Sequence, residues 1–337
     1  MIKNEIIKLL KGRKNLLAFS YGSDSTALFY ILMDLKIEFD LVFINYKTRK
    51  NSDIEELEAK NLAKNFGKKI FIQNAPCFKN NFEKKARDFR YAFFEELCHK
   101  EKYENLILAH QLNDLFEWFL MQFSKGAGLA ELIGMKESLK CKTFTLVRPL
   151  LFVSKDEILS FLKERGLKYF NDESNEDEKY FRNFIRKHFA RTFVSKFPKG
   201  VKKSFKYLNK DLKNLLGDES EILEFGGIFI CKKHESLVSK AVKKMGFVMS
   251  EAQRKEALKG DCVISGKVGV VYVKDDLENE KALIFNYELC EKLPKSFKEK
   301  CRRAKIPKLI RAYFHNHHLE PEDLNHLILK FFGKKDE

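Results

Sequence analysis

Residues Asn15–Ser25 read NLLAFSYGSDS, a short apolar run that leads directly into a turn of small and hydroxyl-bearing residues. The next residues, from Thr26 onward, read TALFYIL and place apolar side chains at helical spacing. A strand, a glycine-containing turn and a helix start are the parts of a phosphate-binding loop, because the first amides of a helix lack intrahelical partners. The alternative is an ordinary strand-to-helix turn in which Ser and Asp side chains cap the helix.

The side chains of this turn suit a polyphosphate. Ser20, Ser23 and Ser25 offer hydroxyl donors, Gly22 lets the backbone come close, and Asp24 is placed to hold Mg²⁺ against phosphates. No Lys follows the glycine, so this is not the loop of the common phosphate-binding NTPases. It resembles the Ser-Gly-Gly-x-Asp-Ser pyrophosphate loop of the ATP pyrophosphatases, which split ATP into AMP and pyrophosphate.

Length and composition predict a protein of two or three domains. A chain of 337 residues is too long for a single hydrophobic core. No apolar run approaches the ~20 residues that are needed to cross a bilayer. The first fifteen residues predict an amphipathic helix rather than a signal peptide. The seven cysteines are scattered and never spaced Cys-x-x-Cys, which argues against disulfides, a zinc ribbon or an iron–sulfur site and favours a reducing cytoplasm.

The charge is strongly basic and unevenly distributed. The net charge is +16, and residues 191–337 carry 31 basic and 21 acidic side chains. Within this half, residues 291–312 carry nine basic and two acidic side chains. Such an excess attracts polyanions, and we expect this segment to touch nucleic-acid phosphates. The alternative is a solvated Lys-rich surface that reflects codon usage in an AT-rich genome.

The first half of the chain alternates strand and helix patterns. Apolar runs typical of buried parallel strands occupy 15–19, 40–46, 69–73 and 105–109. Helical patterns occupy 25–36, 52–66, 82–100 and 113–123. This order predicts a doubly wound α/β fold with a mainly parallel sheet, in which ligands bind at the carboxyl ends of the strands.

Later segments change in character. Helical patterns follow at 154–165, 180–195 and 200–216, and residues 226–273 indicate a small α+β unit. We therefore expect a catalytic domain over 1–195, a helical linker with a small α+β domain over 196–280, and a basic C-terminal region over 281–337.

Three further motifs carry candidate site residues. The first motif places Glu83, Arg87 and Arg90 on one helical face, because they are four and three residues apart. These residues either form a salt bridge within the helix or present a basic face to the active site. Asp114 and Glu117 lie at the start of the next predicted helix, where they either complement its dipole or hold Mg²⁺ or an ammonium group.

The third motif is a pair of arginines one helical turn apart. Arg182 and Arg186 follow the Asp-, Ser- and Asn-rich segment Asn171–Asp177. Together the motifs resemble the tRNA(Ile)-lysidine synthase family. The resemblance covers most of the chain, and Asp172–Arg186 is its most specific part, because it follows the family's Asp-x-Ser-Asn-x-Asp…Tyr-x-Arg-Asn-x-Ile-Arg pattern almost position for position. The other matching segments are Glu83–Tyr91, Arg148–Leu151 and Phe297–Arg311.

This resemblance implies a fold of the adenine nucleotide α-hydrolase type and a ligase that forms a carbon–nitrogen bond. ATP would first adenylate the C2 carbonyl oxygen of the wobble cytosine in the CAU anticodon of tRNA(Ile), releasing pyrophosphate. The ε-amine of free L-lysine would then attack that carbon and expel AMP, leaving lysidine. The implied cofactors are ATP and Mg²⁺, the implied partners are tRNA(Ile) and L-lysine, and a cytoplasmic homodimer is the implied assembly.

The resemblance also assigns residues to roles. The implied catalytic residues are Asp24, Asp114, Glu117 and Arg87, with Asp24 and Asp114 as Mg²⁺ ligands. The implied ATP-binding residues are Ser20, Tyr21, Gly22, Ser23, Asp24, Ser25 and Ile44. The implied tRNA-binding residues are Glu83, Arg87, Arg90, Arg182, Arg186, Lys305 and Arg311.

The sequence departs from the family pattern at several positions. Tyr21 replaces the second loop glycine, which we expect to narrow the space above the pyrophosphate. Residues Phe43–Arg49 replace the family's His-Val-x-His-Gly-Leu-Arg, and Glu131 replaces a usual glycine. In the family's His-His-x-Asp-Asp-Gln-x-Glu-Thr motif, Gln111 and Asn113 replace the second His and the first Asp.

Two other functions remain open at this point. One is a tRNA-thiolating enzyme of the same superfamily, which typically needs a cysteine pair or cluster ligands near its site; Cys77, Cys98 and Cys141 show no paired spacing. The other is a non-catalytic tRNA-binding relative, which Tyr21 and the altered acidic motif would suit. The retained acids and loop hydroxyls argue against it.

Overall fold

The chain divides into two units, Met1–Leu208 and Asn209–Glu337. The computed structural model describes residues 1–47, 52–78, 82–141, 143–170, 180–216, 222–274, 278–290 and 292–324. Of the most specific sequence motif, Asp172–Arg186, residues 172–179 lie outside these residues and Tyr180–Arg186 lie within them. In the described part of the chain, every helix is too short or too polar to span a membrane.

A six-stranded sheet forms the centre of the N-terminal unit. Its spatial order is β3-β2-β1-β4-β6-β5, and every neighbouring pair is parallel except β5 with β6. The predicted doubly wound, mainly parallel sheet is thus confirmed. The strands are β1 (Asn15–Ala18), β2 (Asp40–Asn45), β3 (Ile70–Asn74), β4 (Asn105–Ile107), β5 (Ser138–Lys140) and β6 (Thr145–Val147).

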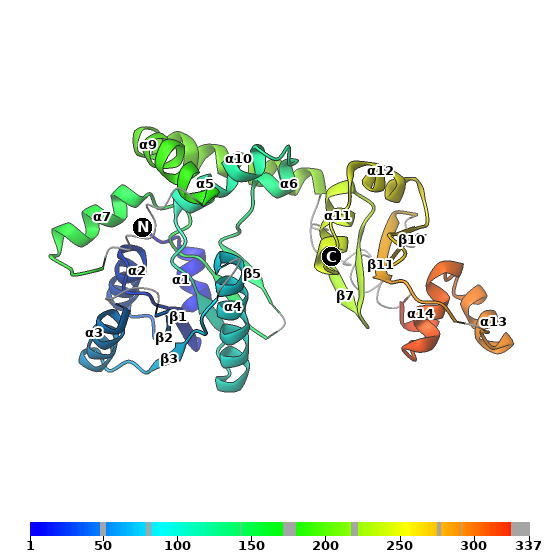
Figure 1. Ribbon diagram of the computed structural model, residues 1–337, viewed down its shortest axis with the longest axis horizontal. Helices are drawn as coiled ribbons and strands as arrows, with labels where there is room; N and C mark the ends of the chain where they lie inside the picture. The colour runs from blue at the N-terminus through cyan, green and yellow to red at the C-terminus, as the bar shows by residue number, and fades with distance from the viewer. Residues whose placement is uncertain are drawn as a thin grey trace. The chain divides into compact units, whose positions relative to one another are not determined.

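Helices cover both faces of this sheet. One face packs on α1 (Asn4–Leu10), α2 (Ser23–Asp34), α3 (Ser52–Asn65) and α7 (Lys155–Glu164), whose buried side chains include Leu28, Leu62 and Ile158. The other face packs on α4 (Phe82–Glu101) through Phe94 and Leu97. Figure 1 shows α2 and α3 on one side of the strands and α4 on the other. This arrangement leaves the carboxyl ends of the strands free for a ligand.

A third group of helices packs on a separate apolar cluster formed by Leu115, Val194, Phe205 and their neighbours. A π-helical turn, Arg186–Ala190, interrupts the helix expected over 180–195, and such turns are frequent at functional sites. The helices of this group are α5 (Leu112–Phe123), α6 (Leu129–Leu132), α8 (Phe181–Ile185), α9 (Arg191–Lys196) and α10 (Pro198–Leu216).

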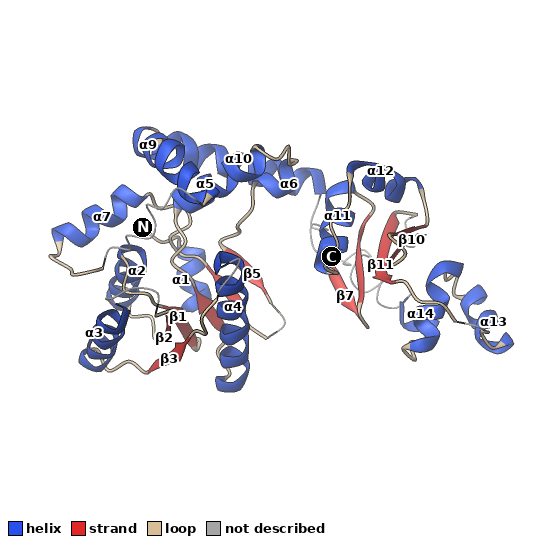
Figure 2. Cartoon of the chain, viewed as in Figure 1, coloured by secondary structure: helices blue, strands red, loops and turns tan. Residues whose placement is uncertain are grey.

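The C-terminal unit is built on a five-stranded antiparallel sheet of order β7-β8-β11-β10-β9. Its strands are β7 (Leu223–Phe225), β8 (Ile228–Lys232), β9 (Cys262–Ile264), β10 (Val268–Lys274) and β11 (Glu280–Asn286). One face packs on α11 (Glu235–Lys244) and α12 (Glu251–Lys259), and the other on α13 (Lys295–Arg303), the 3₁₀ turn Lys308–Ile310 and α14 (Arg311–Asn316) (Figure 2).

The boundary expected between residues 280 and 281 differs from this arrangement. It falls at the start of β11, which lies at the centre of the sheet between β8 and β10. The apolar run ALIFN explains the difference, because its buried side chains Leu283 and Phe285 belong to the same cluster as Phe314 of α14. The two C-terminal parts expected from the sequence therefore share one sheet and one core.

Candidate active site

A cavity of about 950 Å³ opens at the carboxyl ends of β1, β2 and β4. This is the point at which the strand order reverses, and α/β folds bind ligands there. The volume suits a nucleotide-sized ligand. Residues of the cavity wall include most of the predicted ATP-binding and catalytic set, namely Ser20, Gly22, Ser23, Asp24, Ser25, Ile44, Asp114 and Glu117, together with Arg90 and Arg186.

The loop between β1 and α2 leaves the start of α2 open. Gly22 is the N-cap residue, and no side chain caps the helix, so the interpretation as an ordinary capped turn is wrong. Instead, the Ser25 hydroxyl donates to the carbonyl of Gly22 at 3.1 Å and accepts the amide of Ser20 at 3.3 Å. The serines thus hold the loop in shape, while the first-turn amides and the positive end of the helix dipole face an incoming anion.

Tyr21 does not narrow this space, contrary to the expectation from sequence. Its backbone adopts the left-handed conformation at φ 58°, which explains why related loops use glycine there. Its ring is only 7% exposed and packs edge-to-face on Phe19 and Phe170, with ring centroids 5.2 and 5.3 Å apart. Its carbonyl accepts the amide of Phe170 at 2.9 Å. Tyr21 therefore supports the loop from the core side.

Lys155 is a site residue that the sequence analysis missed. Its ammonium group lies 2.5 Å from Oδ1 of Asp24 and 2.6 Å from Oγ of Ser23, and it lines the cavity. Burial raises the pKa of Asp24, and Lys155 acts in the opposite direction. A capping box between Ser154 and Glu157 starts α7 at Lys155. The Ser-x-x-Glu pattern of that box marks the start of a helix in the sequence, but it does not show that Lys155 contacts Asp24.

The structure brings the predicted catalytic acids and two predicted tRNA-binding arginines together. Glu117 is 1% exposed and accepts from Nε of Arg182 at 2.8 Å and from Nε of Arg186 at 2.7 Å. Asp114 accepts from Nη2 of Arg182 at 2.6 Å. We call these four residues the acid–arginine cluster. Its pairing satisfies buried charges that would otherwise be very costly.

Asp114 stays ionised because of its neighbours in this cluster. Burial alone would raise the pKa of Asp114, but Arg182 and other nearby charges hold it below its ordinary value. Burial also lowers the pKa of His110, which lines the same cavity, to about 4. Its Nδ1 accepts from Nε of Arg148 at 3.1 Å. At neutral pH the cavity therefore holds a carboxylate at Asp114 and a neutral imidazole at His110.

The departures at Gln111 and Asn113 have structural roles. The Gln111 side chain accepts the Asn113 amide at 2.7 Å, and Asp114 accepts the Gln111 amide at 3.0 Å, which forms a capping box at the start of α5. The Asn113 side chain in turn accepts the backbone amide of Lys155 at 3.1 Å. These contacts tie the start of α5 to the start of α7, so both sequence changes are compatible with an intact site.

The predicted face of α4 is only partly at the cavity. Arg90 lines it, whereas Glu83 and Arg87 are exposed, and the Arg87 guanidinium lies 4.7 Å from the ring centre of Tyr91. In the C-terminal unit, Nε and Nη2 of Arg311 both donate hydrogen bonds to the carbonyl of Ile306, at 2.9 and 2.8 Å. Lys305 is exposed. The geometry thus gives Arg311 a role in stabilising its own turn.

The residues present fit ATP and one Mg²⁺ ion. Asp24 and Asp114 line the same cavity, and the charge of Asp114 contributes to the raised pKa of Asp24. Among the described residues there is no cluster of three metal-ligating side chains. Mg²⁺ in nucleotide sites typically takes one or two carboxylates and completes its shell with phosphates and water, so two carboxylates suffice.

Cysteine chemistry has no support at this cavity. Among the described residues that line it there is no cysteine. Burial raises the pKa of Cys98 to about 12, which leaves that thiol protonated and unreactive. A thiolating enzyme would need such a group beside its substrate.

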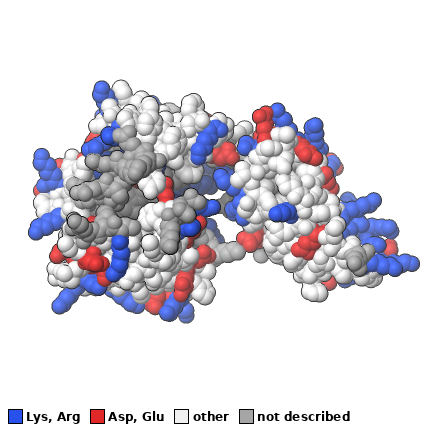
Figure 3. Space-filling model, in the orientation of Figure 1, with Lys and Arg blue, Asp and Glu red and all other residues white. Residues whose placement is uncertain are grey.

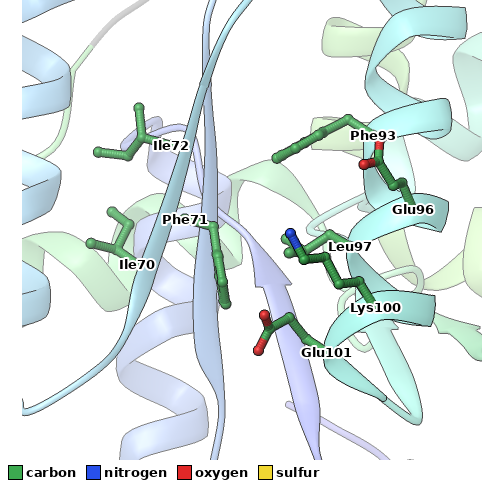
Figure 4. Close-up of a pocket in the computed structure, with 8 residues that line it drawn as sticks. All are labelled: Ile70, Phe71, Ile72, Phe93, Glu96, Leu97, Lys100 and Glu101. Carbon is green, nitrogen blue, oxygen red and sulfur yellow. The ribbon is translucent and has the colours of Figure 1, made fainter.

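A second, smaller cavity of about 350 Å³ lies between β3 and α4 (Figure 4). Its wall is mainly apolar, with Phe71 and Phe93 on opposite sides and charged side chains of α4 beside them. Glu101 on its wall is paired with Lys69 at 3.1 Å. None of the predicted site residues lines this cavity.

Comparison with known proteins identifies the family. The PP-loop domain family matches residues 2–192. The tRNA(Ile)-lysidine synthase of Campylobacter jejuni (strain RM1221) is 62% identical over 324 residues, which cover 96% of this chain and 99% of the relative. That of Helicobacter pylori (strain J99) is 39% identical and covers 92% of this chain and 90% of the relative.

Solved structures support the fold. The U34-tRNA thiolase NcsA of Methanococcus maripaludis, solved with its [4Fe-4S] cluster, matches with a TM-score of 0.50 and 19% identity. The match covers 66% of this chain and 78% of that chain, and at this identity it speaks for the fold alone. From its full-length relatives, its pyrophosphate loop and its cavity, the chain belongs to the tRNA(Ile)-lysidine synthase family of PP-loop enzymes.

Proposed function

We propose that the protein converts the wobble cytidine of the CAU anticodon of tRNA(Ile) to lysidine, using ATP and L-lysine and releasing AMP and pyrophosphate. The observation that carries this proposal is the convergence of two unlike groups in one cavity. The uncapped start of α2 suits a polyphosphate, and the partly buried Asp114 and the buried Glu117 suit a cationic amine.

The first step needs compensation of negative charge on the triphosphate. The amides of the first turn of α2, the hydroxyl of Ser20 and the ammonium of Lys155 would surround the phosphates. Mg²⁺, when bound by Asp24 and Asp114, would neutralise further phosphate charge. Lys155 thereby supplies, from α7, the cation that the loop itself lacks.

The second step needs a neutral amine, although the side chain of free lysine is protonated near pH 7. The carboxylates of Asp114 and Glu117 would attract the ε-ammonium group, in competition with Arg182 and Arg186. One carboxylate of this pair would take a proton from the ammonium group, and the neutral nitrogen would then attack C2. The carbon–oxygen bond to AMP breaks, AMP leaves with the electron pair, and the nitrogen releases its second proton to solvent. The pKa of Asp114 is held low, so Asp114 is a weak base that holds the proton only briefly and passes it on to solvent.

Binding of the whole tRNA would involve the C-terminal unit. Basic side chains gather at the end of this unit that α13 and α14 form (Figure 3), and Arg302, Arg303, Lys305 and Lys308 are exposed. We assign them to phosphate contacts, which position the tRNA without reading its sequence. The homodimer and the cytoplasmic location stay predictions.

A pyrophosphate assay tests the loop assignment. Asp24→Asn is expected to lower tRNA-stimulated ATP–pyrophosphate exchange by roughly 100-fold, since it removes charge that acts on the reacting phosphates. Asp34→Asn, at the other end of α2 and paired with Arg165, is the matched control and should exchange at the wild-type rate. Exchange by Asp24→Asn at the wild-type rate would show that the loop does not bind the reacting phosphates.

A further inference from the structure

Five phenylalanine rings form a continuous row on the surface of the N-terminal unit, which we call the phenylalanine ladder. Its members, in spatial order, are Phe123, Phe119, Phe116, Phe193 and Phe197. Successive ring centres are 5.9, 6.1, 5.1 and 5.2 Å apart, and the rings of the first three pairs are stacked and nearly parallel, with interplanar angles of 11°, 6° and 12°. The first three rings come from α5, Phe193 comes from α9, and Phe197 follows it.

The ladder is exposed at both ends. Phe123 is 64% exposed, Phe193 46% and Phe197 55%. The inner side is anchored, because Phe119 contacts the buried ring of Phe205 edge-to-face at 5.8 Å. Exposed apolar rings that are held in a fixed row mark an interaction surface rather than a core.

The surroundings of the ladder are basic. Residues 180–208 carry nine basic and no acidic side chains. Although Arg182 and Arg186 are paired with buried acids, Arg191, Lys196 and Lys199 are exposed along the same stretch as Phe193 and Phe197. In Figure 3 this part of the unit is a mainly uncharged face with Lys and Arg side chains at its edges.

Aromatic rings flanked by cations suit single-stranded nucleic acid. Unpaired bases stack on aromatic side chains, while the phosphates that join them take the positive charges. A second copy of this chain fits less well, because a symmetric contact through this face would bring its basic stretch against the same stretch of the partner. The charge therefore selects RNA over self-association.

The elements that carry the ladder also form the wall of the catalytic cavity. Glu117 of α5 and Arg191 of α9 both line it. On α5, however, Phe119 and Phe123 lie on the face opposite to Glu117, since they are two and six residues from it. An RNA strand with one base in the cavity therefore reaches the ladder only by crossing α5. We propose that the phenylalanine ladder stacks unpaired anticodon-loop nucleotides that flank the modified cytidine, an inference that rests on the proposed function.

Two surface substitutions test this role. Phe193→Leu with Phe197→Leu keeps apolar side chains but removes two stacking rings. We expect this double variant to bind an anticodon stem–loop with a CAU loop roughly 10- to 100-fold more weakly, as measured by fluorescence anisotropy. Its affinity for a fully paired RNA duplex of equal charge should be unchanged. Phe66→Leu, at another partly exposed ring of the same unit, is the control and should bind both RNAs as the wild type does.

A measurement on the wild-type protein removes any dependence on how the variants fold. A stem–loop with 5-iodouridine beside the CAU triplet should, on irradiation, crosslink to a ring of the ladder. Equal affinity of the double variant and the wild type for the loop RNA, or crosslinks only outside the ladder, would overturn the proposal. So would a dimer that the double variant converts to a monomer with RNA affinity retained, because the ladder would then be a subunit interface.

The proposed function is tested separately by lysine incorporation in the wild type. Ladder-dependent binding of the loop RNA without lysine incorporation would refute the function and leave the ladder assignment standing. Lysine incorporation together with ladder-independent RNA binding would refute only the ladder assignment.

Discussion

Replacement of Lys155 by methionine is expected to weaken ATP binding strongly. The Lys155 ammonium lies 2.5 Å from Oδ1 of Asp24 and 2.6 Å from Oγ of Ser23, at the point where the phosphates would enter. Both charged side chains are 30% exposed, so neither is fully screened by water. A hydrogen bond to a charged group contributes about 1.5–3 kcal/mol. Loss of one such phosphate contact therefore predicts an ATP Kd about 10- to 150-fold higher.

A second effect acts in the same direction. Without Lys155, Asp24 loses its nearest counter-charge, and its carboxylate then repels the polyphosphate. Isothermal titration calorimetry with ATP and Mg²⁺ would measure the combined change. Lys155→Arg keeps the charge and should retain most of the affinity. Lys163→Met, which removes one exposed lysine from the same helix, should leave the Kd within about twofold. An ATP Kd for Lys155→Met close to that of the wild type would refute the assignment of Lys155 to the phosphates.

Three further substitutions probe the rest of the N-terminal unit. Glu117→Gln should lower the free energy of unfolding by about 3 kcal/mol, because it removes the buried negative charge that two guanidinium groups share. Calorimetry should show a fall in Tm of roughly 6–12 °C, and an unchanged Tm would contradict the cluster's role. Tyr21→Gly relieves a left-handed backbone worth about 1 kcal/mol but removes a buried ring worth about 3–5 kcal/mol, so urea unfolding should show net destabilisation with ATP affinity retained. The pKa of His110 is about 4 in the folded protein, below its unfolded value of about 6.5. The neutral imidazole therefore adds to the free energy of unfolding above pH 6.5. This contribution, up to ~3 kcal/mol, is lost as the pH falls toward 4. His110→Asn keeps an acceptor for Arg148 and should flatten that part of the pH–stability curve, whereas parallel curves would contradict the pKa.

The parallel sheet could be predicted because four of its strands lie in continuous apolar runs of the sequence that alternate with helical patterns. Leu41–Phe43 and the apolar residues of β1 and β4 are buried runs typical of sheet interiors, whereas β3 at the edge of the sheet is only partly buried. The strand Thr145–Val147 was missed because it has three residues and lies among polar neighbours. The strand Glu280–Asn286 was missed because it begins with two charged residues, Glu280 and Lys281, at the expected start of the basic terminal region.

The site was predictable as a set of residue types but not as a set of contacts. Asp114 and Arg182 are 68 residues apart, and nothing local in either segment shows that they pair. Lys155 is 131 residues from Asp24 and was hidden for the same reason. At Tyr21, the missing glycine led to the expectation of a narrowed site, whereas the fold gives this residue a left-handed backbone and places its ring in the core.

Exposure was equally invisible in the sequence. The 32 phenylalanines were counted as material for a globular core, yet Phe123 and Phe197 lie on the surface. Helical spacing alone places Phe116, Phe119 and Phe123 on one face of α5 without showing whether that face is covered.

Incorporation of labelled L-lysine into tRNA(Ile) with a CAU anticodon tests the central claim most directly. The wild-type protein should transfer lysine to the wobble cytidine only in the presence of ATP, with one AMP and one pyrophosphate released per lysidine formed. The methionine tRNA with the same anticodon serves as the comparison for specificity. The absence of lysine from the tRNA, or the incorporation of sulfur in its place, would contradict the account.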